Sequence, residues 1–194
     1  MSYAENFLKA IDFRNELFKN EEPINRDVFK TYAEVDNIPK INFEEMYEIC
    51  LDFMYFAINS GFVLTMQCHS ITDKLKTCLQ RNGYSSNEIA VTIGDVAFRN
   101  KRMYNLDENK MIEIINKGKD LTATLNLHVW LTYKTIYVFD LTIIPYLLKS
   151  KKIPKPDIDD HLLMAWHDNN KWELEYYPIL VDNEFYNRVD GKSY

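Results

Sequence analysis

A chain of 194 residues, of which 46% are hydrophobic and 14% aromatic, is long and apolar enough to fold around its own core, so a disordered chain is excluded. Its formal net charge of −6 is spread without a basic patch, which argues against nucleic acid or an anionic membrane as a partner. No apolar run approaches the ~20 residues that a membrane-spanning helix needs. We expect one domain over residues 1–194, with a helical part (1–60), a core (61–143) and a C-terminal extension (144–194).

The cysteines and the N-terminus bear on where the protein works. Cys50, Cys68 and Cys78 form neither an even disulfide framework nor a Cys-x-x-Cys metal site, so reduced thiols and a cytoplasmic location are expected. The first residues lack the basic stretch followed by an apolar core that marks a cleavable signal peptide. Export by a route without such a signal stays open, as does the oligomeric state.

Hydrophobic spacing predicts helices for the N-terminal part of the chain. They cover residues 3–19, 26–35 and 43–60. Asn42 is a candidate N-cap of the third helix, and Gly61 is a candidate for its C-terminal stop. The apolar stripe of that helix, which we expect in the core, consists of Phe43, Met46, Cys50, Phe53 and Ala57.

The helix that follows carries Cys68 and ends at Asn82-Gly83. Its apolar face consists of Cys68, Ile71, Leu75, Cys78 and Leu79. If the helix begins near Gln67, the dipole and free amides of its first turn favour a thiolate at Cys68 and can bind an oxyanion. A capping box of Ser70 and Asp73 would instead start the helix two residues later and leave Cys68 in the preceding loop. The sequence does not decide between these two starts.

A strand is predicted over residues 89–98, and a helix around 111–115 inside a charged segment that could form a wall of the site. Residues 121–133 then alternate with period two, apolar at the odd positions and polar or amphipathic at the even ones. His128 is at an even position and so belongs to the less apolar face of this strand. That place argues against a histidine that merely fills the core.

The next strand, residues 136–143, alternates in the same way and has Asp140 on its even side. An antiparallel hairpin joins the two apolar faces only if the numbers of paired residues have an even sum. A three-residue loop from Tyr133 to Thr135 meets this condition and places His128 directly opposite Asp140. The pattern therefore predicts that this histidine and this aspartate share one face.

The C-terminal extension offers no metal site. Its acids, Asp157, Asp159 and Asp160, follow two prolines and are interpreted as part of a solvated loop. His161 and His167 would be about 240° apart around a helix, which makes them poor ligands of one ion. We expect no metal and no cofactor. The remaining predicted elements are a half-buried strand over residues 171–180 and a packed segment with Phe185 and Tyr186.

Three of these residues together predict a chemistry. A thiol is a weak nucleophile until a nearby imidazole takes its proton, and a carboxylate that fixes the tautomer of the imidazole improves this base. We therefore expect Cys68, His128 and Asp140 to meet as nucleophile, base and orienting acid of an acyl-transfer site. Gln67 is a candidate for binding the oxyanion or the substrate, and Trp130 for a substrate-binding wall.

The same residues stand in short motifs that resemble the transglutaminase-like superfamily, within the broader papain-like group. Gln67-Cys68 resembles the Gly-Gln-Cys-Trp of that family, with Met66 and His69 in place of the glycine and the tryptophan. His128-Val129-Trp130 resembles its His-x-Trp, and Asp140-Leu141-Thr142 resembles its Asp-x-Thr. The resemblance covers roughly residues 61–143.

The resemblance implies an α+β fold, in which N-terminal helices and the Cys68 helix pack on an antiparallel sheet that bears His128 and Asp140. It also implies cysteine-dependent acyl transfer on an amide or peptide, as in transglutaminases, peptidases and amide hydrolases, with a protein, a peptide or a small amide as the substrate. The family includes inactive binding proteins as well. A catalytically inactive interaction module with the same fold is therefore the alternative, and the reactivity of Cys68 distinguishes the two.

Overall fold

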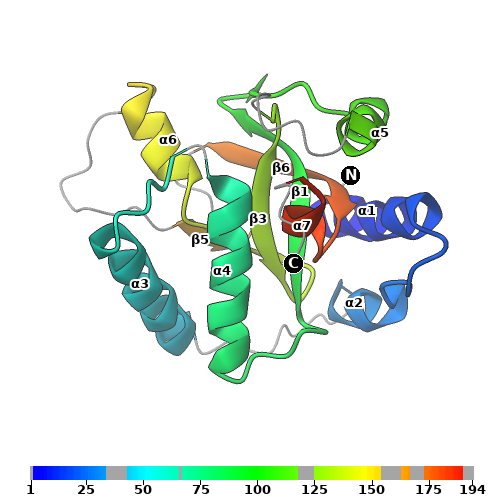
Figure 1. The fold of residues 1–194 in the computed structure, drawn as a ribbon, viewed down its shortest axis with the longest axis horizontal. Coiled ribbons are helices and arrows are strands. Elements are labelled where there is room, and N and C mark those ends of the chain that lie inside the picture. Colours follow the sequence, from blue (N-terminus) through cyan, green and yellow to red (C-terminus); the bar gives the residue numbers. More distant parts are fainter. Residues whose placement is uncertain are drawn as a thin grey trace.

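The structure, a computed structural model, describes residues 2–33, 43–65, 67–117, 125–153, 163–166 and 173–189. In these ranges seven helices pack on one antiparallel β-sheet, so the fold class is α+β, as expected (Figure 1). The helices are α1 (Tyr3–Leu17), α2 (Arg26–Ala33), α3 (Phe43–Asn59), α4 (Cys68–Arg81), α5 (Glu108–Lys117), α6 (Ile143–Lys149) and α7 (Phe185–Val189). The strands are β1 (Ile89–Phe98), β2 (Lys101–Arg102), β3 (His128–Tyr133), β4 (Tyr137–Asp140), β5 (Leu163–Trp166) and β6 (Leu174–Val181).

The sheet is built around β1. Its order is β2-β1-β3-β4-β5, β6 pairs with β1 as well, and all of these pairings are antiparallel. Thr92, Ile93 and Gly94 each have a partner in β3 and another in β6, so β1 is paired along both of its sides.

Helices cover both faces of the sheet (Figure 1). The buried residues of α3, α4 and α7 form one core with the odd-numbered residues of β3 and β4. The buried residues of α1, α2 and α6 form the other core with the even-numbered ones. All residues of β3 are accordingly buried, which is why the strand carries bulky side chains on both sides.

The less apolar face of β3, which carries His128, is therefore not a solvent-facing one. Its polar side chains bond one another and the helix that covers them. The hydroxyl of Thr132 lies 2.5 Å from that of Tyr3 in α1 and 2.7 Å from that of Thr92 in β1. The indole Nε1 of Trp130 donates to the Tyr3 hydroxyl at 2.8 Å. These bonds satisfy buried polar groups that would otherwise cost free energy.

Several predicted elements are confirmed with nearly their predicted bounds. β1 spans the predicted residues 89–98, and α4 ends with Asn82 as its C-cap. α3 also ends where Gly61 predicts its C-terminal stop. Gly61 has a φ of 80°, and its N–H donates to the carbonyl of Ile58. The N–H of Phe62 donates to the carbonyl of Ala57, which completes the Schellman motif.

The sequence pattern does not predict β2, β5 or α6. It extends the second hairpin strand to residue 143, whereas β4 ends at Asp140 and α6 begins three residues later. The carboxylate of Asp140 accepts hydrogen bonds from the backbone N–H groups of Thr142 and Ile143, which turns the chain out of the sheet. Pro145 lies in the first turn of α6, where a missing N–H costs nothing.

The β3–β4 hairpin has the predicted face but not the predicted pairing. Leu131 pairs with Phe139, and continuing this register places Trp130, and not His128, opposite Asp140. The prediction that His128 stands directly opposite Asp140 is therefore wrong by one pair. His128 and Asp140 are diagonal neighbours on the same face, a position from which long side chains still reach each other.

The loop of this hairpin explains the shift. It consists of residues 134–136, because Lys134 and Thr135 both adopt left-handed conformations, with φ of 46° and 67°, and the N–H of Ile136 donates to the carbonyl of Tyr133. The hydroxyl of Thr135 donates to the carbonyl of Phe29 in α2 at 2.7 Å. That contact joins residues far apart in the sequence, so no local pattern contains it.

Some expectations concern residues outside the described ranges: Asn42 as a cap, the strand residues 121–124, the acids Asp157, Asp159 and Asp160, and the histidines His161 and His167. Among the described residues, no helix is long and apolar enough to span a membrane. The same residues contain no group of three or more His, Cys, Asp and Glu side chains placed to hold a metal ion.

Candidate active site

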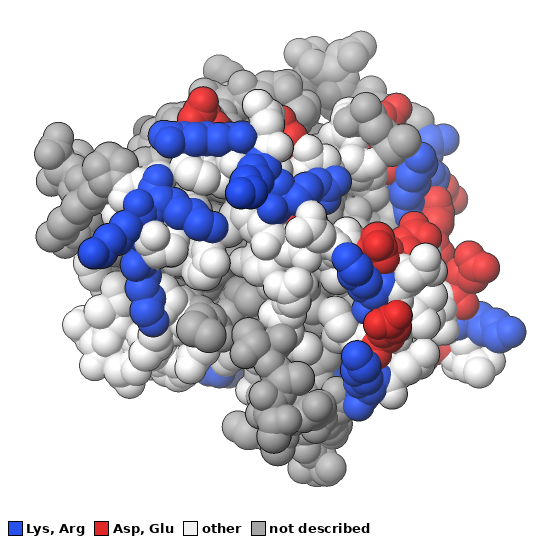
Figure 2. All heavy atoms as spheres, turned by 90° about the horizontal axis from the view of Figure 1, so that it is seen from above, with Lys and Arg blue, Asp and Glu red and all other residues white. Residues whose placement is uncertain are grey.

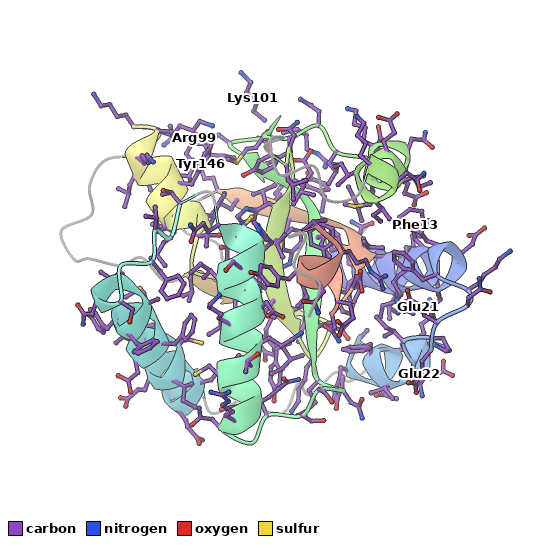
Figure 3. The ribbon with its side chains drawn as sticks, viewed as in Figure 1. Phe13, Glu21, Glu22, Arg99, Lys101 and Tyr146 are labelled. Atoms are coloured by element: carbon purple, nitrogen blue, oxygen red, sulfur yellow. The ribbon has the colours of Figure 1, made fainter. Side chains whose placement is uncertain are left out.

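The candidate site lies at the end of the sheet where β3 begins and β4 ends, since His128 and Asp140 are the terminal residues of those strands. Cys68 is the first residue of α4, whose N-terminus lies at this same end (Figure 1). Tyr146 of α6 and Arg99 and Lys101 beside the β1–β2 turn also lie at this end (Figure 3). A helix and the two strands of one hairpin thus deliver the three predicted catalytic residues.

The position of Cys68 follows from where α4 starts. Gln67 is the N-cap, and the N–H of Ile71 donates to its carbonyl at 2.9 Å. The capping box of Ser70 and Asp73 is not formed, and the hydroxyl of Ser70 instead accepts a bond from the Nζ of Lys74. Cys68 is therefore in the first turn, where the backbone N–H groups have no partner within the helix.

α4 is held against β3 close to the site. The hydroxyl of Thr72, one turn after Cys68, donates to the carbonyl of Val129 at 3.2 Å. Ile71 and Leu75 are buried between the helix and the sheet. The packing of this helix thus fixes the height of Cys68 above the start of β3.

The two carboxylate oxygens of Asp140 have different partners: Oδ1 bonds to the turn that follows β4, and Oδ2 bonds to side chains of the site. Oδ1 accepts bonds from the N–H and the hydroxyl of Thr142 at 2.8 and 2.9 Å and from the N–H of Ile143 at 3.1 Å. Oδ2 lies 2.5 Å from Nε2 of His128 and accepts a bond from the Tyr176 hydroxyl at 3.0 Å. The Asp-x-Thr motif therefore has a physical role, because the threonine fixes the carboxylate that orients the histidine. Burial raises the pKa of Asp140, but the charge of His128 and these bonds outweigh it and hold the pKa below 3.8.

Aromatic rings surround the imidazole of His128, which is 3% exposed. The ring of Tyr104 stacks on it with a centroid distance of 6.0 Å, and the ring of Trp130 lies 6.1 Å away. Tyr176 packs edge-on against Trp130 at 5.0 Å. These contacts hold the imidazole ring of His128 in one orientation. Since Nε2 faces Asp140, Nδ1 is the nitrogen available to the thiol of Cys68.

The thiol of Cys68 is partly buried and hydrogen-bonds to both His128 and His69. Burial raises the pKa of the thiol, but the bonds and the charges of the two histidines outweigh it and lower the pKa from 9.0 to about 6. Burial lowers the pKa of His128, whereas Asp140 and Cys68 together raise it from 6.5 to about 10. Near neutral pH the pair is therefore a thiolate and an imidazolium.

The structure brings Cys68, His128 and Asp140 together, as the sequence predicts. Gln67 lies next to the thiol as the helix N-cap and is partly buried. Trp130 was predicted to bind substrate, but its side chain is 0% exposed and lies behind the imidazole, where it contacts the protein core. In this structure its role is to support His128.

Sequence reasoning missed three residues of the site. Tyr176 comes from β6 and is 36 residues from Asp140, and Tyr104 comes from the loop after β2, so no local spacing points to either. His69 follows Cys68 directly and stacks on Tyr186 of α7 at 5.6 Å. Its position beside the nucleophile was the one signal that could have indicated it.

No protein-family model matches the chain, and neither a curated protein nor a solved structure matches it. The chemistry of the site is therefore inferred from its own geometry. That geometry contains a nucleophile, a base hydrogen-bonded to it, and a carboxylate fixed behind the base.

Proposed function

We propose that this protein carries out cysteine-dependent acyl transfer on an amide or peptide substrate. The observation that carries the proposal is the continuous hydrogen-bonded chain from Cys68 through His128 to Asp140. An isolated cysteine in a protein core needs no such chain. The order of the three residues and their motifs supports a transglutaminase-like reaction, and the three free cysteines are in keeping with the reducing conditions of a cytoplasm.

In the first half of the reaction the Cys68 thiolate attacks the carbonyl carbon of the substrate. A bond forms between Sγ and that carbon, and the carbonyl oxygen takes the negative charge. The backbone N–H groups of the first turn of α4 are donors for this oxyanion, with the Gln67 side chain beside them. Because the helix fixes these N–H groups before the reaction starts, they stabilise the oxyanion without having to reorganise.

Collapse of the tetrahedral intermediate breaks the carbon–nitrogen bond. His128 gives the proton on Nδ1 to the leaving amine, which departs neutral and leaves a thioester on Cys68. His128 is then a neutral base with Nε2–H still bonded to Asp140. It takes a proton from water or from an acceptor amine, which attacks the thioester and releases the free thiolate as the product leaves.

The test is the pH dependence of alkylation of Cys68 by iodoacetamide, with each cysteine followed by peptide mass mapping. We expect the rate at Cys68 to rise with a midpoint near pH 6, because the thiolate is the reactive form. Cys78 is a control on the same helix, since burial raises the pKa of its thiol above 9.0 and it should react only at higher pH. His128→Phe should move the Cys68 midpoint upward and leave Cys78 unchanged.

Turnover completes the test. With a library of fluorogenic peptide amides, Cys68→Ser should abolish hydrolysis while the circular dichroism spectrum stays that of the wild type. A thiol at Cys68 that reacts no faster than Cys78 at neutral pH would contradict the enzyme and favour the inactive interaction module. A reactive thiol without hydrolysis would restrict the chemistry to transfer onto an acceptor amine that the library lacks.

A further inference from the structure

The large apolar side chains that are exposed among the described residues all lie on α3 and the loop after it. They are Tyr47 (42% exposed), Tyr55 (51%), Phe56 (65%), Ile58 (41%) and Val63 (55%). Scattered exposed apolar residues are ordinary, but their concentration on one element marks an interaction surface.

α3 is apolar around more of its circumference than its packing needs. It packs on α4, and its buried residues Met46, Cys50, Met54 and Ala57 fall within about 80° of the helix circumference. Tyr55 lies about 100° beyond the edge of that arc, with Tyr47 and Ile58 between them. These three residues form an exposed band that the core does not explain.

The band has an acidic border and no basic one. Glu48 and Asp52 are exposed and follow Tyr55 around the helix within about 60°. The sequence contains no lysine or arginine between Lys40 and Lys74. The surface of α3 is therefore apolar along one strip and negative along the next.

We propose that this face of α3 docks an amphipathic, basic segment of a partner protein. Apolar side chains of that segment would cover Tyr47, Tyr55 and Ile58, and its lysines or arginines would face Glu48 and Asp52. An anionic membrane fits less well, because the acidic strip repels it. Burial of apolar side chains supplies the affinity, and the charges supply the orientation.

The segment after α3 leads to the candidate active site. The chain runs from the end of α3 through exposed Val63 to Cys68. Lysines follow α6 at the end of the molecule that carries the thiol, where lysine and arginine side chains are prominent (Figure 2). These lysines repel a basic segment, so the basic segment itself remains docked on α3. The part of the partner chain that flanks the segment then extends toward Cys68. This delivery of a substrate rests on the proposed function, whereas the docking does not.

The experiment uses the full-length Cys68→Ser protein, so that binding is separate from chemistry. The probes are a fluorescein-labelled helical peptide made of leucine and lysine and its counterpart made of leucine and glutamate. By fluorescence anisotropy we expect the lysine peptide to bind at least tenfold more tightly than the glutamate peptide. Glu48→Lys combined with Asp52→Lys should weaken the lysine peptide at least tenfold. Glu16→Lys, a single charge reversal at an exposed position of α1, should have no effect.

A second variant tests the apolar strip. Tyr55→Ser with Ile58→Ser should also weaken binding at least tenfold, and both side chains are exposed enough for the fold to persist, which circular dichroism checks. Equal affinity of both peptides, or equal effects of the α3 and α1 variants, would overturn the docking proposal. Binding of the protein to phosphatidylglycerol vesicles, or dimerisation in sedimentation that the α3 variants abolish, would overturn it in favour of a membrane or a second copy. None of these results depends on whether Cys68 is reactive, which the alkylation profile measures.

Discussion

Cys68 hydrogen-bonds to two imidazole rings that are supported differently. His128 is held by the carboxylate of Asp140 and is enclosed by aromatic rings. His69 has a tyrosine ring, that of Tyr186, against it. The first ring has a partner that stabilises its positive charge, so it is the one equipped to hold and release a proton during the reaction. The second acts through the thiolate and is a positioning residue.

His69→Phe separates the two contributions. Phenylalanine keeps a flat ring against Tyr186 but cannot donate to the thiolate, so the pKa of Cys68 should rise above about 6. The alkylation midpoint should then lie between those of the wild type and of His128→Phe. His69→Gln, which retains an N–H donor, is the matched variant and should restore part of the shift. An unchanged midpoint in His69→Phe would show that the His69 bond does not act on the thiol.

The site residues differ in how far sequence could reach them. The three catalytic candidates stand in motifs whose order and strand position could be recognised. Trp130 could be recognised too, but not its burial, because burial depends on Tyr3 of α1 and Tyr176 of β6. Residues that act by packing from distant elements leave no local signal.

Among the elements, β1 carries a tight contact beside the site, at Gly94. Gly94 pairs with His128 on one side and with Pro178 on the other, and the register shifts between Ile93 and Gly94. A Cβ at this glycine would overlap the carbonyl oxygen of Tyr177 and lie 2.8 Å from Cη2 of Trp130. The missing side chain lets β6 and the indole approach the strand closely.

Gly94→Ala should therefore destabilise the protein by about 3 kcal/mol or more, because backbone and a buried indole cannot both yield. Urea unfolding measures the change. The displaced Trp130 should also disturb His128, so the alkylation midpoint of Cys68 should rise. A loss below about 1 kcal/mol with an unchanged midpoint would mean that β6 shifts freely, contrary to this packing.

The elements that sequence predicts best are those whose pattern is local. β1 and α4 are bounded by their own hydrophobic periods and by Asn82-Gly83. The hairpin loop is a different case. The alternation predicts the sheet face of His128 and Asp140, but it does not predict which residues pair. The observed pairing occurs together with a contact between Thr135 in the loop and Phe29 in α2, which are far apart in the sequence. β5 owes its place to pairing with β4, which no single segment encodes.

For the whole molecule, the ion pair links stability to pH. The pKa of His128 is raised from 6.5 to about 10, so its stabilising effect is complete below pH 6.5 and is lost as the pH rises through 10. The pKa of Cys68 is lowered from 9.0 to about 6, so its effect is complete above pH 9.0 and is lost as the pH falls through 6. Between 6.5 and 9.0 these two dependences cancel.

Cys68→Ser removes the contribution of the Cys68 thiolate to the pH dependence of stability. The wild type should therefore gain stability relative to this variant as the pH rises from 6 to 9, and the difference should level off above 9. Free energies of unfolding in urea at several pH values measure it. A difference that stays constant across this range would mean that Cys68 is not a thiolate in the folded protein.

α1 packs against β6, and β6 also supplies the tyrosine that bonds to Asp140. During translation, β6 is synthesised after every other described strand. α1 therefore cannot pack against β6 until most of the chain has been made. The carboxylate behind His128 lacks its phenolic donor for the same interval. Assembly of the reactive centre is thereby delayed until nearly all of this sequence has been translated, and a chain stalled earlier carries a thiol that is not yet fully supported.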